Sequence, residues 1–128
     1  MKKTLSFLLL VLLLITGCTS QPADLNYRQI SSAEAAELMQ QENDYIILDV
    51  RTQKEYAEGH IPDAICIPNE TIGDAEITAL PDKNQFILVY CRSGNRSKQA
   101  AQKLADLGYT NIVEFGGINS WTGDVVTE

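Results

Sequence analysis

The sequence has no surplus of positive charge, no cysteines at metal-ligand spacing and no internal repeat. Its 128 residues include 10 lysines and arginines against 17 aspartates and glutamates, for a formal net charge of -7 at pH 7. No basic stripe is present to neutralise phosphates, which argues against a nucleic-acid-binding protein. The three cysteines, Cys18, Cys66 and Cys91, form no C-x-x-C or Cys/His pair. This argues against a structural zinc site, and no metal or cofactor is predicted.

The rest of the composition is ordinary for a globular protein. Hydrophobic residues make up 45% of the chain and charged residues 21%, which does not indicate disorder. A chain of this length suits one domain with a real core and is too short for two.

The first 18 residues have the pattern of an export signal. Lys2 and Lys3 precede an apolar run over residues 5–15, which is too short to cross a bilayer comfortably, and small residues lead to Cys18. The end of this segment resembles the bacterial lipobox, in which cleavage falls just before the cysteine. The resemblance implies removal of residues 1–17 and a diacylglyceryl thioether on Cys18, usually with an added N-acyl chain. The alternatives are an uncleaved anchor and a plain signal peptide with an incidental cysteine.

Under this interpretation the protein is exported and held by lipid on the extracytoplasmic side of a bacterial membrane. Several acyl chains give stable anchoring where one would be marginal. Residues 18–26 would form a short polar tether and residues 27–128 the folded domain. Loss of Lys2 and Lys3 brings the net charge to -9, so the acidic body is not expected to lie flat on anionic lipid.

The folded domain alternates strand and helix patterns. Near-continuous apolar runs indicate strands that are buried on both faces, and capping-box patterns indicate the starts of helices. The predicted strands cover residues 27–30, 45–50, 64–67, 86–90 and 112–115, and the predicted helices cover 31–41, 52–58, more weakly 71–80, and 97–107. Such alternation predicts an α/β fold with a parallel sheet of about five strands and helices on both faces.

The most reactive candidate lies in the loop that follows the strand over residues 86–90. A helix opens directly behind this loop, so its backbone N–H groups and the positive end of the helix dipole converge on one spot. That environment lowers the pKa of a thiol, and the thiolate is the reactive form. The loop consists of Cys91, Arg92, Ser93, Gly94, Asn95, Arg96 and Ser97.

Four segments together resemble a rhodanese domain, over essentially all of residues 27–121. They are LDVR at 48–51, EYAEGHIPDA at 55–64, CRSGNRS at 91–97 and GGINSW at 116–121. The resemblance implies a sulfurtransferase in which Cys91 carries a persulfide between two half-reactions. A small anionic donor such as thiosulfate would supply the sulfur, and a thiol, a cyanide-like acceptor or a protein would remove it.

The resemblance also assigns roles to the neighbouring residues. The amides from Arg92 to Ser97 would cradle anionic groups, and Gly94 would allow the tight curvature of the loop. Arg92 is expected to contact substrate. Arg96 has two interpretations of equal weight, a substrate contact or a structural ion pair with a carboxylate such as Glu55 or Asp49.

Other polar and aromatic side chains receive supporting roles. Asp49 and Arg51 follow the neighbouring strand and are expected to shape the pocket, with a loop-fixing hydrogen bond as the alternative for Asp49. His60 is assigned to packing and hydrogen bonding, because the family uses no histidine base. Trp121 is expected to be a core or rim aromatic.

Three alternatives to sulfur transfer remain. Cysteine phosphatases and arsenate reductases share the thiolate-in-cradle design, but phosphatases place five residues between cysteine and arginine, and here only four separate Cys91 from Arg96. A non-catalytic binding module typically loses the cysteine. A thiol redox protein would pair Cys91 with Cys66, but in the family's sheet their strands are two spacings, about 10 Å, apart, whereas a disulfide needs Cα atoms within about 7 Å. Cys66 is therefore assigned to packing as a small buried side chain.

Overall fold

The structure is a computed structural model that describes residues 25–128. The proposed signal peptide, the lipid attachment at Cys18 and most of the tether lie outside the described residues. In the part that is described, no helix is both long and apolar enough to cross a membrane. The elements in chain order are β1 (Arg28–Gln29), α1 (Ser32–Gln41), β2 (Tyr45–Asp49), α2 (Gln53–Glu58), β3 (Ile65–Cys66), β4 (Phe86–Cys91), α3 (Asn95–Asp106) and β5 (Ile112–Gly117), with short 3-10 turns at Asn69–Thr71 and Ile118–Ser120.

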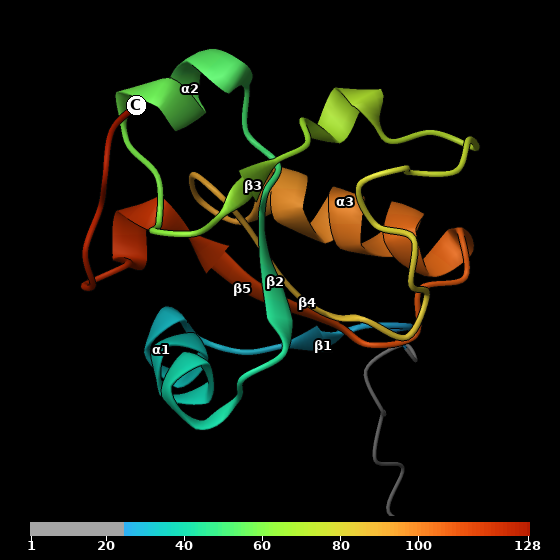
Figure 1. The fold of residues 1–128 in the computed structure, drawn as a ribbon, viewed down its shortest axis with the longest axis horizontal. Helices are drawn as coiled ribbons and strands as arrows, with labels where there is room; N and C mark the ends of the chain where they lie inside the picture. Colours follow the sequence, from blue (N-terminus) through green and yellow to red (C-terminus); the bar gives the residue numbers. More distant parts are fainter. Residues whose placement is uncertain (1–24) are drawn as a thin grey trace, which may run out of the picture.

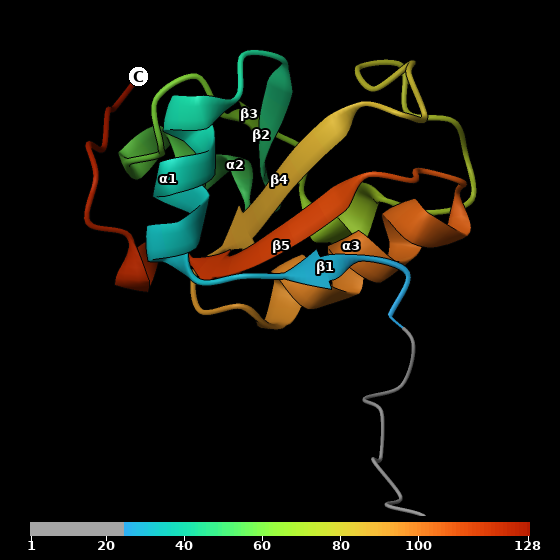
Figure 2. The same ribbon diagram turned by 90° about the horizontal axis from the view of Figure 1, so that it is seen from below.

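The five strands form one parallel sheet in the order β1-β5-β4-β2-β3 (Figure 1). Helix α3 covers one face of this sheet, and α1 covers the other, as the view in Figure 2 makes plain. Right-handed crossovers between parallel strands place helices on both faces in this way. The predicted α/β fold is confirmed, and β4 lies at the centre of the sheet with Cys91 at its carboxyl end, the edge at which ligands bind in open α/β sheets.

Successive side chains along β4 and β5 point alternately to the two faces of the sheet. Ile87, Val89 and Cys91 point to the α3 side, where they pack with Ala100 and Leu104 of that helix. A second core lies on the other face of the sheet. It contains Leu88 and Tyr90 of β4 and Val113 and Phe115 of β5, together with Ala35 of α1. Strands β4 and β5 are therefore buried on both faces, which explains their near-continuous apolar runs.

Side-chain hydrogen bonds cap α1 and α2 at the helix starts that the sequence predicts. Thr52 and Glu55 form a full capping box at the start of α2, with each side chain bonded to the other's backbone N–H. At α1 only half of the predicted box forms: the Ser31 hydroxyl accepts from the Glu34 N–H at 3.1 Å. Gly108 follows the end of α3 with a φ of 96°, a left-handed conformation that favours glycine.

The strand boundaries differ from the prediction by one or two residues, and two of the predicted helices differ more substantially. The prediction of a helix over residues 71–80 is wrong: a 3-10 turn at Asn69–Thr71 ends where this helix is predicted to begin, and residues 72–80 form no helix. Ile72 and Leu80 are both buried and fix the two ends of this segment in the core, while Gly73 favours no helix between them. Helix α3 begins at Asn95, two residues before the predicted start, with Gly94 as its N-cap.

The C-terminal segment is an extended strap along the edge near α2 (Figure 1). His60 and Val126 form an isolated antiparallel bridge, with reciprocal N–H to carbonyl bonds of 2.9 Å. Trp121 is half-buried against Phe115, and its indole N–H donates to the Asp124 carbonyl at 3.0 Å. The strap thus holds the segment that follows α2 in place.

Candidate active site

Cys91 is the last residue of β4, and its side chain lies beneath the loop that connects this strand to α3. The residue is only 1% exposed, and its Sγ accepts a 3.0 Å hydrogen bond from the Gly94 N–H. Gly94 has a φ of 111°, which turns the loop back over the sulfur and starts the helix. The sulfur is therefore held at the N-terminal end of α3, where the helix dipole favours negative charge.

Opposing effects act on the Cys91 thiol. Burial by itself raises its pKa. The hydrogen bonds of the Ser97 hydroxyl and of the backbone N–H groups of Ser97, Gly94 and Ser93 outweigh burial, so that the pKa of Cys91 lies below its usual value. Hydrogen bonds to the charged form favour ionisation, and the thiolate is the nucleophile. The site can therefore supply a nucleophilic sulfur without a neighbouring base in contact with it.

Ser97 ties the loop to β5. Its hydroxyl is fully buried, lies 3.4 Å from the Cys91 sulfur, and donates to the Glu114 carboxylate at 2.6 Å. The same Glu114 oxygen accepts from the Gly116 N–H at 2.8 Å. Glu114 itself is only 2% exposed. Thiol, hydroxyl and carboxylate therefore form a continuous hydrogen-bonded chain inside the protein.

Close packing at Gly117 fixes the other side of the loop. A side chain at Gly117 would collide with the Arg92 carbonyl, so that only glycine allows the two backbones to approach. The Asn119 N–H also donates to the Arg92 carbonyl at 3.2 Å. The close approach to the Arg92 carbonyl thus explains Gly117, and its neighbour Gly116 has a φ of 86°, which favours glycine.

Glu55 binds both arginines of the loop. Arg96 makes two parallel hydrogen bonds to its carboxylate, of 2.8 and 3.0 Å, and the Arg92 Nε donates to it at 3.2 Å. The hydrogen bond from Arg96 lowers the pKa of Glu55 well below its usual range, and burial only partly opposes this. Of the two carboxylates named as partners for Arg96, the structure pairs it with Glu55. The Arg92 side chain is 57% exposed and stands at the rim of the loop.

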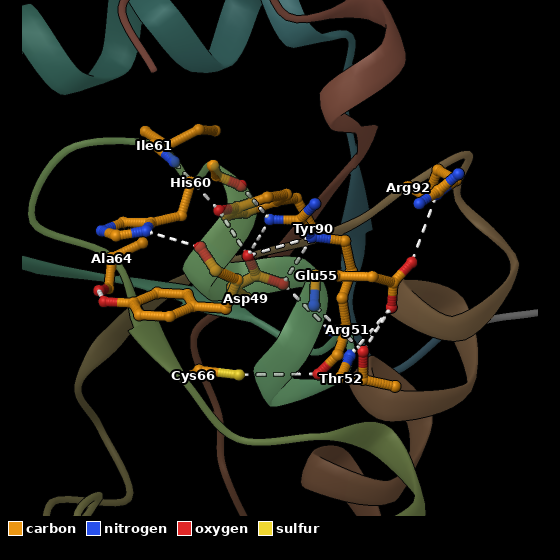
Figure 3. A network of polar contacts seen from close by, with 12 residues as sticks. Asp49, Arg51, Thr52, Glu55, His60, Ile61, Ala64, Cys66, Tyr90 and Arg92 are labelled. Atoms are coloured by element: carbon orange, nitrogen blue, oxygen red, sulfur yellow. Dashed lines mark hydrogen bonds and ion pairs between the residues drawn. The ribbon is translucent and has the colours of Figure 1, made fainter. Parts of the chain in front are cut away.

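Asp49 and Arg51 form a buried pair behind the loop (Figure 3). Arg51 Nη2 donates to Asp49 at 2.7 Å and to the Gly59 carbonyl at 2.7 Å. The Tyr90 hydroxyl donates to the same Asp49 oxygen, Oδ2, at 2.7 Å and accepts from the Ile61 N–H at 3.1 Å. Asp49 is fully buried and Arg51 is 4% exposed, so both act by holding the segment after α2 rather than by lining an open surface.

The buried environment changes the acid–base properties of this network. Burial alone would lower the pKa of Arg51, but the hydrogen bond and charge of Asp49 raise it above its usual value. Burial is also the main cause of the raised pKa of Tyr90. Arg51 therefore stays charged and Tyr90 stays protonated as a donor.

His60 and Cys66 lie on this side of the sheet (Figure 3). The His60 ring stacks on Tyr56 with centroids 3.7 Å apart, and its Nδ1 lies 2.8 Å from the Tyr56 carbonyl, a packing arrangement. Cys66 is partly exposed rather than fully buried, because β3 is an edge strand. Burial of its thiol raises the pKa of Cys66 to about 11. Strand β2 separates β3 from β4, so Cys66 stands two strands from Cys91, and both thiols are free.

Three residues of this site carry roles that the sequence alone did not reveal. Tyr90 holds Asp49, Glu114 holds Ser97, and Gly117 admits the loop. Glu114 could have been noticed as a charged residue within an apolar strand. Among residues 25–128, no group of three or more histidine, cysteine, aspartate and glutamate side chains is arranged to hold a metal ion.

Fold and site together define a parallel α/β protein with a single cradled cysteine at the carboxyl end of its central strand. A family model for the rhodanese-like domain matches residues 31–124, and the chain belongs to this family.

Known relatives agree with this membership. The chain is 39% identical over 71 residues to the thiosulfate sulfurtransferase PspE of Escherichia coli K12, covering 56% of this chain and 68% of the relative. It is 35% identical over 94 residues to a sulfurtransferase of Allochromatium vinosum, covering 73% and 86% of the two chains. Among solved structures, a rhodanese with anions from E. coli superposes with a TM-score of 0.60 at 34% identity, covering 66% of this chain and 99% of the other. A rhodanese-like protein from Staphylococcus aureus gives a TM-score of 0.67 at 31% identity, over 79% and 98%.

Proposed function

We propose that this protein is a sulfurtransferase that moves a sulfane sulfur from an anionic donor such as thiosulfate to a thiophilic acceptor, through a persulfide on Cys91. The observation that carries the proposal is the Cys91 sulfur beneath the loop amides, with the Gly94 N–H 3.0 Å away and four residues between Cys91 and Arg96. Relatives named as sulfurtransferases, at 35–39% identity, support the same reaction class.

The chemistry takes place in two displacements on sulfur. The Cys91 thiolate attacks the outer sulfur of thiosulfate, a Cys91 S–S bond forms, and sulfite leaves with the electrons of the broken bond. A nucleophile such as cyanide or a thiolate then attacks the outer sulfur of the persulfide, and Cys91 departs as the thiolate. No oxidant or reductant is consumed, and the two substrates never meet, so ping-pong kinetics are expected.

The loop suits each charge that appears in this cycle. Backbone N–H groups at the N-terminus of α3 face the thiolate and the persulfide, both of which are anionic. Arg92 is the better candidate for contact with the incoming donor, because its side chain is 57% exposed and holds Glu55 through one nitrogen. Arg96 uses both terminal nitrogens on Glu55 and serves to hold the loop. Asp49 and Arg51 contribute by fixing the segment after α2.

A thiosulfate and cyanide assay tests the proposal. Thiocyanate formation should give parallel lines in double-reciprocal plots at several cyanide concentrations. Cys91→Ser should abolish it, and Cys66→Ser, a matched change two strands away, should keep it. Activity in Cys91→Ser, or its loss in Cys66→Ser alone, would refute the role of Cys91.

We propose in addition that residues 1–17 are removed and that Cys18 carries the lipid that attaches the domain to the extracytoplasmic side of a bacterial membrane. Support comes from the order of the two lysines, the apolar run and the cysteine in the sequence. Labelling with a radioactive fatty acid tests this. The label should appear on the wild-type protein and be absent from Cys18→Ala, and a labelled Cys18→Ala protein would refute the lipid attachment.

A further inference from the structure

Ser97 has more acceptors than it can serve. Its hydroxyl oxygen lies 2.6 Å from the Glu114 carboxylate, 3.0 Å from the Gly94 carbonyl, 3.2 Å from the Gly116 carbonyl and 3.4 Å from the Cys91 sulfur. A hydroxyl has a single proton to donate. The shortest contact is to the charged acceptor, and such charge-assisted bonds are about twice as strong as neutral ones. The proton therefore points to Glu114, and the Cys91 thiol can only donate to the oxygen that remains.

Glu114 is built into this position. It is 2% exposed, its strand neighbours Val113 and Phe115 face the opposite core, and its side chain points to the α3 side beneath the loop. One of its oxygens accepts from both Ser97 and the Gly116 N–H.

We propose that Glu114 is a positioning residue for the reactive cysteine: it competes with the Cys91 sulfur for the single proton of the Ser97 hydroxyl and so limits how strongly the loop stabilises the thiolate. When a thiolate forms, Ser97 must turn from Glu114 toward the sulfur, or the two negative charges must face each other across it. In both cases Glu114 opposes the ionisation that the loop amides favour. This inference deepens the proposed sulfur transfer and rests on it for its significance.

Other charged groups around the pair stay constant in the test. On α3, Arg96 interacts electrostatically with Cys91 but is bound by Glu55 of α2, and Arg92 of the loop is bound by the same carboxylate. Near Glu114, Tyr27 has a raised pKa, mainly through burial and then through the charge of Glu114. A substitution that removes the charge of Glu114 should therefore lower the pKa of Tyr27. This decrease is an internal control for the loss of the charge.

The test is a pH titration of the Cys91 thiolate by its ultraviolet absorbance, taken as the difference from the same protein with Cys91→Ser. Glu114→Gln keeps the shape but is a weaker acceptor, so Ser97 turns to the sulfur. The pKa of Cys91 should fall by about one unit, a tenfold change in the thiolate equilibrium, or ~1.4 kcal/mol. Glu42→Gln, an exposed residue at the C-terminal cap of α1, should leave the pKa unchanged.

A double-mutant cycle separates positioning from a direct effect of charge. Ser97→Ala removes the hydroxyl for which Glu114 and the sulfur compete, so in this background Glu114→Gln should no longer lower the pKa of Cys91. A pKa that stays the same or rises in Glu114→Gln overturns the proposal, and so does a fall that persists in full without Ser97.

A second measurement does not depend on the folding of the Glu114 variant. The infrared S–H stretch of Cys91 in the wild-type protein, below its pKa, should have the lowered frequency of a hydrogen-bonded thiol and rise in Ser97→Ala. An unchanged band would overturn the proposal. Neither experiment requires sulfur transfer, so a failure here would leave thiosulfate loading intact, while a failure of sulfur transfer would leave these titrations as predicted.

Discussion

Replacement of Asp49 by asparagine tests whether the buried pair behind the loop holds the fold together. The Asp49 carboxylate is fully buried and accepts from the Arg51 backbone N–H at 2.9 Å, from its guanidinium at 2.7 Å and from the Tyr90 hydroxyl at 2.7 Å. An amide keeps the volume, but it removes the charge and places an NH₂ group against other donors. The Arg51 side chain, 5% exposed, is then left as a buried charge without a counter-ion, with neutral oxygens such as the Gly59 carbonyl as its acceptors.

The expected loss follows from this geometry. Removing one partner of a buried ion pair costs about 3–5 kcal/mol, because the other charge stays buried and uncompensated. With a denaturant slope of ~1.5 kcal/mol per molar urea, a loss of ~4 kcal/mol lowers the unfolding midpoint by roughly 2–3 M. Urea unfolding followed by far-ultraviolet circular dichroism at pH 7 measures this shift.

Two controls sharpen the result. Asp44→Asn is the same substitution at an exposed position before β2 and should change the stability by less than about 0.5 kcal/mol. Adding Arg51→Met to Asp49→Asn removes the stranded charge, so the double variant should be more stable than Asp49→Asn alone. A midpoint for Asp49→Asn that matches Asp44→Asn, or a double variant less stable than the single one, would refute this account of the pair.

Three further predictions concern the residues around the loop. Because the pKa of Glu55 is lowered on folding, its ion pair stabilises the protein above the unfolded pKa of about 4.3 and loses this effect as the pH falls through the folded pKa. Glu55→Gln should therefore lower the free energy of unfolding in urea by about 1 kcal/mol at pH 7, and this difference from the wild type should narrow below pH 4. A difference that stays constant with pH would contradict the prediction. Gly94→Ala should lose roughly 1–2 kcal/mol because of its positive φ, whereas Gly73→Ala, with open space around it, should change the thermal midpoint little. Cys66, with a pKa of about 11, should react slowly with iodoacetamide at pH 7, and its reaction rate should rise tenfold per pH unit up to about pH 10. Peptide mapping that finds Cys66 labelled equally fast at pH 7 and pH 9 would disprove the raised pKa.

Much of the fold could be predicted because its signals are local. Side-chain caps such as Thr52 with Glu55 mark the helix starts, and apolar runs mark strands buried on both faces. The prediction of a helix that includes residues 72–80 failed because two separate side chains, Ile72 and Leu80, are buried in the core and set the path of this segment. No repeating helical face is involved. Tertiary packing overrides weak propensity in such segments.

The candidate site divides in the same way. The loop from Cys91 to Ser97 is contiguous, so strand, turn and helix could be read together. Glu114 and Tyr90 come from strands whose register decides which side chain meets the loop, and no local pattern reports that register. The exposure of Cys66 likewise depends on its position in an edge strand.

The most direct test of the central proposal is the intact mass of the purified protein after incubation with thiosulfate and removal of the excess. The proposed mechanism predicts a gain equal to one sulfur atom, carried by the peptide that contains Cys91, released as thiocyanate by cyanide and absent in Cys91→Ser. An unchanged mass, or a sulfur found on Cys66 instead, would contradict it.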